Sequence, residues 1–290
     1  MAAKRETDRI SGVETTGHEW DGIKELDNPL PNWWRWILWA TVVWAVGYWI
    51  VYPAWPLVSG HTKGVLGYSS RAELAEELAA AKQAQAKFVE KIRTASLEQI
   101  RTQPDLLEFA LAGGRAAFSV NCSQCHGSGA QGAKGYPNLN DDEWLWGGTP
   151  TMIEKTITHG VRNGVDPDAR DSQMPAFLAD GILKRGQVDD VAEFVLKLSG
   201  QAHDAAKASR GAGIFAEQCV ACHGEKGQGN REFGAPPLSN NIWLYGGDRN
   251  TIADVVANSR RGVMPAWGRI LDPVTVKQLA IYVHSLGGGH

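Results

Sequence analysis

The longest apolar stretch of the chain lies near its N-terminus. Residues 36–60 contain no charged side chain, and residues 37–51 are almost wholly apolar. About 20 such residues in a helix are enough to cross the hydrocarbon core of a bilayer. Tryptophan and tyrosine flank the stretch on both sides, as they do at the two interfaces of a membrane. The pattern predicts one transmembrane anchor helix over residues 33–57, preceded by a separate N-terminal segment, residues 1–32.

A cleaved signal peptide is the alternative interpretation of this stretch. A secretory signal begins with a short basic region and ends at a cleavage site of small residues. The segment up to Asn32 instead carries four basic and seven acidic side chains, and no A-x-A pattern follows the apolar stretch. The sequence therefore favours an anchor that stays in the mature protein.

Residues 58–104 are expected to form a helical linker. The part from 69 to 100 is rich in Ala, Glu, Lys and Gln and contains neither Gly nor Pro, which gives it a high helical propensity. A thin apolar stripe along this helix is expected to pack on a neighbouring element. Its members are Leu74, Leu78, Phe88, Ile92 and Ile100.

The remainder of the chain is an internal duplication. Each copy has a C-x-x-C-H string, a tryptophan-containing segment that ends in Gly-Gly, a helical stretch and a Met-Pro-Ala-aromatic string. Apolar residues at helical spacing close each copy. They are Val188, Val191, Val195 and Leu198 in the first copy and Val276, Leu279, Val283 and Leu286 in the second. The duplication predicts two tandem domains of one fold, residues 105–200 and 201–290.

A glycine and a phenylalanine precede the C-x-x-C-H string in both copies, as Gly114 and Phe118 and as Gly211 and Phe215. We expect the glycine to let the first helix of a domain cross its last helix closely. The phenylalanine is then expected to meet an aromatic residue of the last helix of its own copy. The predicted core pairs are Phe118 with Phe194 and Phe215 with Tyr282.

Charge and cysteine content narrow the chemistry. The formal net charge is −3 and no long basic run occurs, so nothing points to nucleic acid as a partner. All four cysteines fall in the two C-x-x-C-H strings, which leaves none for a disulfide framework. Two thiols at this spacing reach both vinyl groups of one haem, and the adjacent histidine then lies beneath the iron. The strings predict two covalently bound haem c groups, held by Cys122, Cys125, His126, Cys219, Cys222 and His223.

A zinc site or a redox-active dithiol is the alternative for a single C-x-x-C-H string. A four-cysteine zinc site would here have to close the long loop between the two strings. The presence of two strings, each with its own histidine and a methionine further along the chain, favours haem.

The sixth ligand of each iron is expected to be a methionine. Met174 and Met264 stand at matching positions of the two copies, each directly before a proline. A thioether ligand raises the potential of a haem and leaves no open coordination position, which suits electron transfer. Filling a gap in the core is the common alternative for a single methionine, and His159 is the main competing ligand. The predicted iron ligands are His126 and Met174 in the first copy and His223 and Met264 in the second.

Further matching positions are candidates for contacts with haem. Pro137 and Pro236 resemble the proline of small cytochromes c whose carbonyl accepts the proton on the far nitrogen of the ligand histidine. Two tryptophans and two arginines are candidates for bonds to haem propionates, with a buried tryptophan and a solvated arginine as the alternatives. They are Trp144, Trp243, Arg162 and Arg261.

These motifs resemble a known family. The string G-x-x-x-F-x-x-x-C-x-x-C-H, the P-x-L step and the later M-P resemble class I cytochrome c. Residues 18–34, HEWDGIKELDNPLPNWW, resemble the stretch that opens the di-haem P subunit of cbb3-type haem-copper cytochrome c oxidases. The resemblance covers nearly the whole chain. It implies an all-α fold with one N-terminal transmembrane helix, a helical linker and two tandem class I cytochrome c domains.

The resemblance also implies partners and a location. Such a subunit accepts electrons from a soluble or membrane-bound cytochrome c. It passes them to a mono-haem c subunit and then to a catalytic haem b and copper subunit, where oxygen is reduced and protons are pumped. Because bacteria attach haem c outside the cytoplasmic membrane, we expect a single-pass inner-membrane protein with a cytoplasmic N-terminus and periplasmic haem domains. Residues 106–200 hold twelve acidic and eight basic side chains, which would steer a basic donor to the first domain.

Two other functions compete with this one. A free-standing di-haem shuttle, or the electron-acceptor subunit of a membrane dehydrogenase, would have the same domains, and only residues 18–34 argue against it. A di-haem peroxidase needs one iron to become five-coordinate, which a matched methionine in both copies does not favour.

Overall fold

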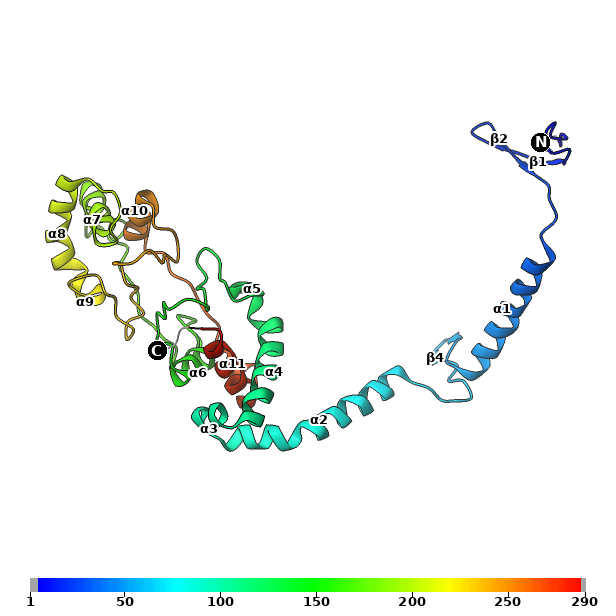
Figure 1. Ribbon diagram of the computed structural model, residues 1–290, viewed down its shortest axis with the longest axis horizontal. Coiled ribbons are helices and arrows are strands. Elements are labelled where there is room, and N and C mark those ends of the chain that lie inside the picture. Colours follow the sequence, from blue (N-terminus) through cyan, green and yellow to red (C-terminus); the bar gives the residue numbers. More distant parts are fainter. Residues whose placement is uncertain (1–4, 288–290) are drawn as a thin grey trace. The chain divides into compact units, whose positions relative to one another are not determined.

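The computed structural model describes residues 5–287. The chain forms two compact units, Met1–Gln83 and Ala84–His290, which are described separately. Figure 1 labels the elements along the chain. In the first unit they are β1 (Thr15–Trp20), β2 (Ile23–Leu26), α1 (Asn32–Val51), β3 (Pro56–Leu57), β4 (Gly60–His61) and the beginning of α2 (Ser70–Thr94). In the second unit they are α3 (Leu97–Thr102), α4 (Pro104–Asn121), α5 (Ser123–His126), α6 (Pro150–His159), α7 (Arg185–Leu198), α8 (Ala205–Gln218), α9 (Val220–His223), α10 (Arg249–Asn258), η1 (Trp267–Arg269) and α11 (Pro273–Ser285).

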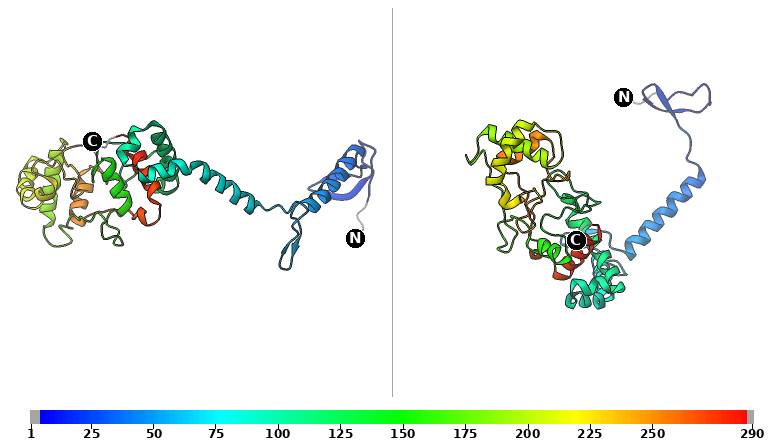
Figure 2. Two further views of the ribbon diagram at one scale, coloured as in Figure 1. Left: turned by 90° about the horizontal axis from the view of Figure 1, so that it is seen from below. Right: turned by 60° about the vertical axis from the view of Figure 1, so that its left-hand side comes forward.

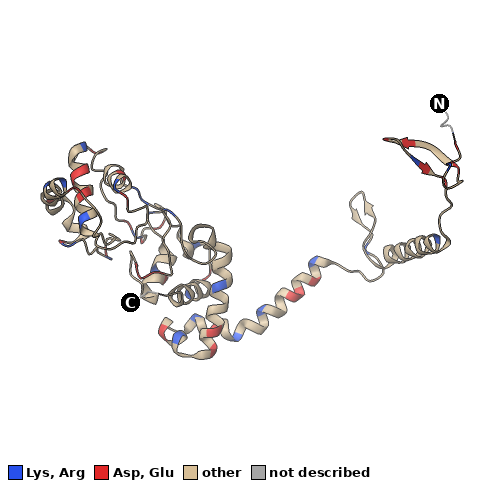
Figure 3. Ribbon diagram, turned by 45° about the horizontal axis from the view of Figure 1, so that its top comes forward, with Lys and Arg blue, Asp and Glu red and all other residues tan. Residues whose placement is uncertain are grey.

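Helix α1 corresponds to the expected anchor. Within residues 5–287 it is the one helix that is long and apolar enough to cross a membrane, and none of its residues is buried. Arg35 is its single charged side chain, whereas β1 and β2 carry acidic residues (Figure 3). The helix ends at Val51, before the predicted end at residue 57, because Pro53 cannot continue it.

The first unit also contains two short antiparallel hairpins that the all-α expectation did not include. In the first hairpin Trp20 pairs with Ile23, and the turn between them is Asp21-Gly22. Both turn residues have positive φ, +48° and +84°, which is the conformation that a two-residue hairpin turn requires. The Asp-Gly pair is thus the local signal for this hairpin, and the helical expectation holds for the second unit.

The second unit has two hydrophobic cores, which do not coincide with the two sequence repeats. In the first core α11 packs against α4 and α6, and in the second core α7 packs against α8 and α10. Figures 1 and 2 both show α11 beside α4, and α7 beside α8. Each repeat therefore supplies its last helix to the core of the other repeat.

The aromatic pairs follow this exchange of helices. Phe118 lies 5.5 Å from Tyr282, and Phe215 lies 5.1 Å from Phe194, measured between ring centroids. The predicted pairs were wrong because each phenylalanine meets the last helix of the other repeat. The glycine beside it does allow a close crossing, as expected. A Cβ at Gly114 would lie 2.3 Å from the carbonyl oxygen of Gln278.

Polar residues explain which last helix enters which core. Asp190 of α7 is buried, and Arg210 of α8 donates two hydrogen bonds to its carboxylate, at 2.6 and 2.9 Å. At the corresponding crossing in the first core, Gln278 of α11 lies over Gly113 of α4. Without the exchange Asp190 would face Gly113 and its buried carboxylate would lose its partner, which is strongly destabilising. The ion pair therefore favours α7 in the second core.

The linker helix α2 ends against the first core. Ile92 is fully buried there, whereas Leu74 and Leu78 of the predicted stripe are more than half exposed. Lys277 of α11 donates hydrogen bonds to three main-chain carbonyls at the end of α2, those of Ile92, Arg93 and Ala95. A cation at this position satisfies the terminal carbonyls and the helix dipole, so α11 also holds the linker.

Candidate haem-binding sites

Both C-x-x-C-H strings form a single helical turn. Helix α4 ends before Cys122, and the turn α5 follows it, with the amide of His126 donating to the carbonyl of Cys122 at 2.9 Å. Gly127, with φ of +82°, then turns the chain away. The second copy repeats this arrangement in α9 and Gly224. One turn of helix places both thiols and the imidazole on one face, as attachment to a single haem requires.

Each histidine is oriented by a proline carbonyl, as the sequence predicted. Nδ1 of His126 lies 3.0 Å from the carbonyl oxygen of Pro137, and Nδ1 of His223 lies 2.9 Å from that of Pro236. Because a carbonyl can only accept, Nδ1 carries the proton and Nε2 keeps its lone pair for a metal. Burial lowers the pKa of both histidines against the opposing effect of the proline carbonyl, which favours the neutral imidazole.

One thiol of each string, that of Cys122 or Cys219, lies in surroundings that favour its neutral form. Burial, and secondarily the neighbouring Cys125 and Cys222, raise the pKa of Cys122 and Cys219 to about 11. Zinc binding and thiol–disulfide exchange both depend on the thiolate, which these surroundings disfavour. A neutral thiol in an apolar wall is instead compatible with conversion to a thioether, which carries no charge.

A cavity in the second core is lined by several of the predicted haem-binding residues. Cys219, Cys222 and His223 line it together with Met174, which comes from the first repeat. Apolar side chains of α7, α8 and α10 form much of the remaining wall. This placement disagrees with the predicted pairing of Met174 with His126, because Met174 lines the cavity of the other C-x-x-C-H string.

The first core contains the reciprocal arrangement. Met264 and Cys122 both pack against it, although Met264 belongs to the second repeat. The segment of Met264 is joined to Val161, just beyond α6, by two backbone hydrogen bonds, at 3.0 and 2.9 Å. The methionines are thus exchanged in the same way as the helices that follow them.

A buried N–H group without a hydrogen-bond partner in the first core indicates that a haem would fit there. Nε1 of Trp144 is buried and has no hydrogen-bond partner among the described residues. Leaving such a donor unsatisfied costs about 1–3 kcal/mol. A propionate would supply the acceptor, so Trp144 fits the predicted role. Its counterpart Trp243 lines the cavity of the second core.

The two arginines predicted to bind haem propionates lie at the same site and not at one site each. Arg162 and Arg261 both line the cavity that contains His223, although Arg162 belongs to the first repeat. Burial lowers the pKa of Arg162, Tyr245 and Asp171 oppose this effect, and the charge of Arg261 adds to it. Two cationic side chains in the wall of one cavity fit an anionic group such as a propionate.

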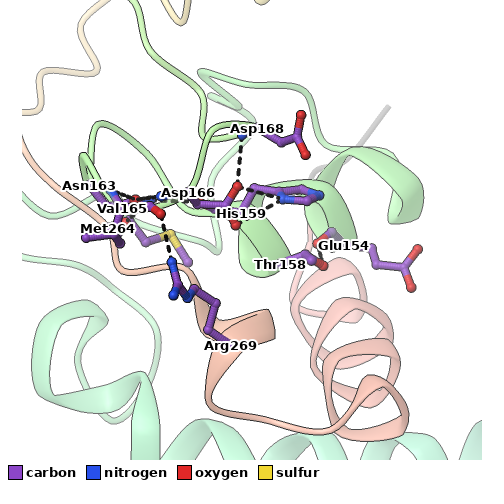
Figure 4. Close-up of polar contacts among 9 residues, drawn as sticks. All are labelled: Glu154, Thr158, His159, Asn163, Val165, Asp166, Asp168, Met264 and Arg269. Atoms are coloured by element: carbon purple, nitrogen blue, oxygen red, sulfur yellow. Dashed lines mark hydrogen bonds and ion pairs between the residues drawn. The ribbon is translucent and has the colours of Figure 1, made fainter.

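His159, the competing ligand, is engaged elsewhere. Its Nδ1 lies 3.2 Å from both carboxylate oxygens of Asp166, in the stretch that the second repeat lacks (Figure 4). The pKa of Asp166 is lowered, mainly by the backbone amide of Asp168 and then by His159. Sequence reasoning missed this pair, for which the insertion after His159 was the only available signal.

Family models match three parts of the chain. Residues 12–59 match the family described as the N-terminal domain of cytochrome oxidase-cbb3, FixP. Residues 111–199 match cytochrome c, and residues 206–283 match cytochrome c oxidase, cbb3-type, subunit III. These matches confirm the two cytochrome c domains that the sequence predicted.

Full-length relatives carry the same assignment. The chain is 53% identical over 293 residues to a cbb3-type cytochrome c oxidase subunit FixP of Bradyrhizobium sp. (strain ORS 278), with 100% of both chains covered. It is 52% identical over 294 residues to subunit CcoP of Azospirillum brasilense, with 99% of each covered. It is 50% identical over 289 residues to CcoP of Cereibacter sphaeroides, with 100% of each covered. The chain therefore belongs to the CcoP/FixP family, the electron-transfer subunits of cbb3-type cytochrome c oxidases that carry cytochrome c domains.

Proposed function

We propose that this chain is a di-haem electron relay in which the two repeats exchange their methionine ligands. One haem c is attached to Cys122 and Cys125, with His126 and Met264 as iron ligands. The other is attached to Cys219 and Cys222, with His223 and Met174. The observation that carries this proposal is the cavity that His223 shares with Met174 of the other repeat.

Each bound haem would supply a one-electron iron couple. The protein holds the imidazoles neutral through the proline carbonyls. The two methionine segments would supply an uncharged sulfur donor to each iron, which would stabilise the reduced state and leave no open coordination position. With both positions filled, the sites favour electron transfer over the binding of peroxide or another substrate.

We further propose that α1 anchors the chain in a bacterial inner membrane, with residues 1–32 in the cytoplasm and the haem domains in the periplasm. The partners would be a mono-haem c subunit, a catalytic haem b and copper subunit, and a cytochrome c donor. Full-length similarity to named oxidase subunits supports this assembly. Isolation from native membranes in mild detergent tests it, because a free-standing shuttle would separate without haem b or copper.

The ligand exchange can be tested in the full chain with one haem at a time. Replacing Cys122 and Cys125 by Ala leaves only the attachment site of the second string. In this chain Met174→His should abolish the far-red sulfur-to-iron charge-transfer band of the ferric protein. Met264→His is the matched control and should leave that band in place.

The reciprocal chain, with Cys219 and Cys222 replaced by Ala, should give the opposite result. There the band should depend on Met264 and not on Met174. Dependence of each band on the methionine of its own repeat would overturn the exchange. Absence of the band from the unmodified di-haem protein would overturn methionine ligation altogether.

A further inference from the structure

The segments that carry the two methionines run beside each other between the two cores. We call residues 161–162, 172–174 and 259–264 the crossover. Its first link consists of the two backbone hydrogen bonds between Val161 and Met264. A second link runs from the hydroxyl of Ser259 to the carbonyl oxygen of Met174. Each methionine segment is therefore attached just beyond the helix, α6 or α10, of the core that it enters.

Arg162 connects the two segments to each other. Its Nε donates to the carbonyl oxygen of Gly262 at 2.9 Å, and its Nη1 donates to that of Ser172 at 3.0 Å. Gly262 precedes Met264 by two residues, and Ser172 precedes Met174 by two residues. One guanidinium thus holds both methionine segments at the same offset from the sulfur.

The position of Arg162 has energetic costs that this role would offset. The side chain is half buried, and burial lowers its pKa. Among the described residues no carboxylate is within ion-pair distance of its guanidinium, although the charge of Asp171 acts on it from farther away. The guanidinium lies 5.9 Å from the ring centre of Trp146. Its backbone has φ of +49°, which is unfavourable for a residue other than glycine. Conformations of this kind persist when the surrounding structure requires them, commonly at functional sites.

We propose that Arg162 is a positioning residue for both methionine ligands, so that the two haem sites share one clamp. This inference rests on the exchanged ligation proposed above. A thioether is a neutral and weak donor, so its bond to iron depends on how firmly the surrounding segment is held. The planar guanidinium suits the task because it presents several N–H groups in a fixed geometry. Asn163 adds a longer hydrogen bond to the Met264 carbonyl, at 3.4 Å (Figure 4).

A role limited to one haem is the competing interpretation, since Arg162 also lines the cavity with His223. An arginine that only neutralises a propionate would change the potential of that haem alone, and lysine would largely replace it. A clamp would affect the sulfur ligation of both haems. Lysine would not restore it, because a single ammonium group cannot reproduce the rigid fork to two carbonyls.

The test uses the full chain with both haems attached. Arg162→Gln and Arg162→Lys are each placed in Met174→His and Met264→His backgrounds, so that one sulfur-ligated iron remains to be observed at a time. We expect both substitutions to weaken the sulfur-to-iron band severalfold in both backgrounds and to increase carbon monoxide binding by the reduced protein. If Arg162→Gln fails to accumulate, the lysine variant alone decides, because it retains the charge.

Arg170→Gln is the matched control. Arg170 also lies over Trp146, at 5.4 Å, but donates to Thr156 and Met152 and not to the methionine segments. It should leave both bands unchanged. If Arg162→Lys keeps the sulfur-to-iron band in both backgrounds, or weakens it in only one of them, Arg162 is not a clamp shared by the two sites. A parent protein without these bands would instead overturn the ligation proposal itself.

Discussion

Removal of the Leu279 side chain should weaken the haem site of the other repeat. Leu279 lies in α11, is fully buried, and packs in the core that contains Cys122 and Met264. If each repeat closed its own core, the same substitution would weaken the site of His223. Leu279→Ala therefore distinguishes the exchanged arrangement from the simpler one.

The magnitude follows from the complete burial of the side chain. Replacing a buried leucine by alanine costs about 2–5 kcal/mol, with the larger values where the cavity does not collapse. Gly114 and Gln278 bring the backbones of α4 and α11 into close contact at this crossing, which limits collapse. We expect about 3 kcal/mol, or roughly a hundredfold in the unfolding equilibrium of the first core. With a urea dependence of about 2 kcal/mol per molar, the midpoint falls by about 1.5 M.

The assay follows sulfur ligation during urea unfolding in two backgrounds. In Met174→His the remaining band should report the first core, and in Met264→His it should report the second. Leu279→Ala should lower the midpoint in the first background and have a much smaller effect in the second. Val191→Ala in α7, which is also buried, should give the reverse pattern. An effect of Leu279→Ala confined to the second background, or equal shifts in both, would contradict the exchange of helices between the two cores.

Three further predictions concern pH, donor binding and the haem environment. The pKa of Glu193 is lowered in the folded protein, first by the Asp204 amide and then by Arg249. The carboxylate therefore stabilises the fold at pH values above the pKa of the unfolded chain, about 4.5. This stabilisation is lost as the pH falls through the lower pKa of the folded state. Glu193→Gln should flatten the acid dependence of the urea midpoint of the second core, and an unchanged slope would contradict this assignment. Reversing the charges at 141–143 should slow reduction by a basic cytochrome c severalfold at low salt and weaken its salt dependence; unchanged kinetics would exclude this docking site. Trp144→Phe should lower the potential of the haem attached to Cys122 without altering that of the other haem, as measured by redox titration; equal potentials in mutant and parent would show that its indole N–H does not contact a propionate.

Features of this chain that depend on composition or on short-range geometry could be predicted from its sequence. The anchor follows from an uncharged stretch of sufficient length, because the bilayer sets the number of residues that a helix needs. The C-x-x-C-H turn is equally local, since two thiols and an imidazole at these spacings share a face of one helical turn. The hydrogen bonds from His126 and His223 to the proline carbonyls were predictable for a related reason, because in each copy only a short loop separates donor from acceptor.

Only the tertiary structure decided which repeat closes which core. The two copies carry the same glycine, aromatic and methionine pattern, so no local signal distinguishes α7 from α11 or Met174 from Met264 as partners of a given C-x-x-C-H string. The choice depends on contacts between residues far apart in the chain. Asp190 finds a cation at Arg210 and would meet only Gly113 in the other core. A pattern shared by both repeats predicts the fold of a core, whereas buried charge and close packing between distant segments select the helix and the methionine that complete it.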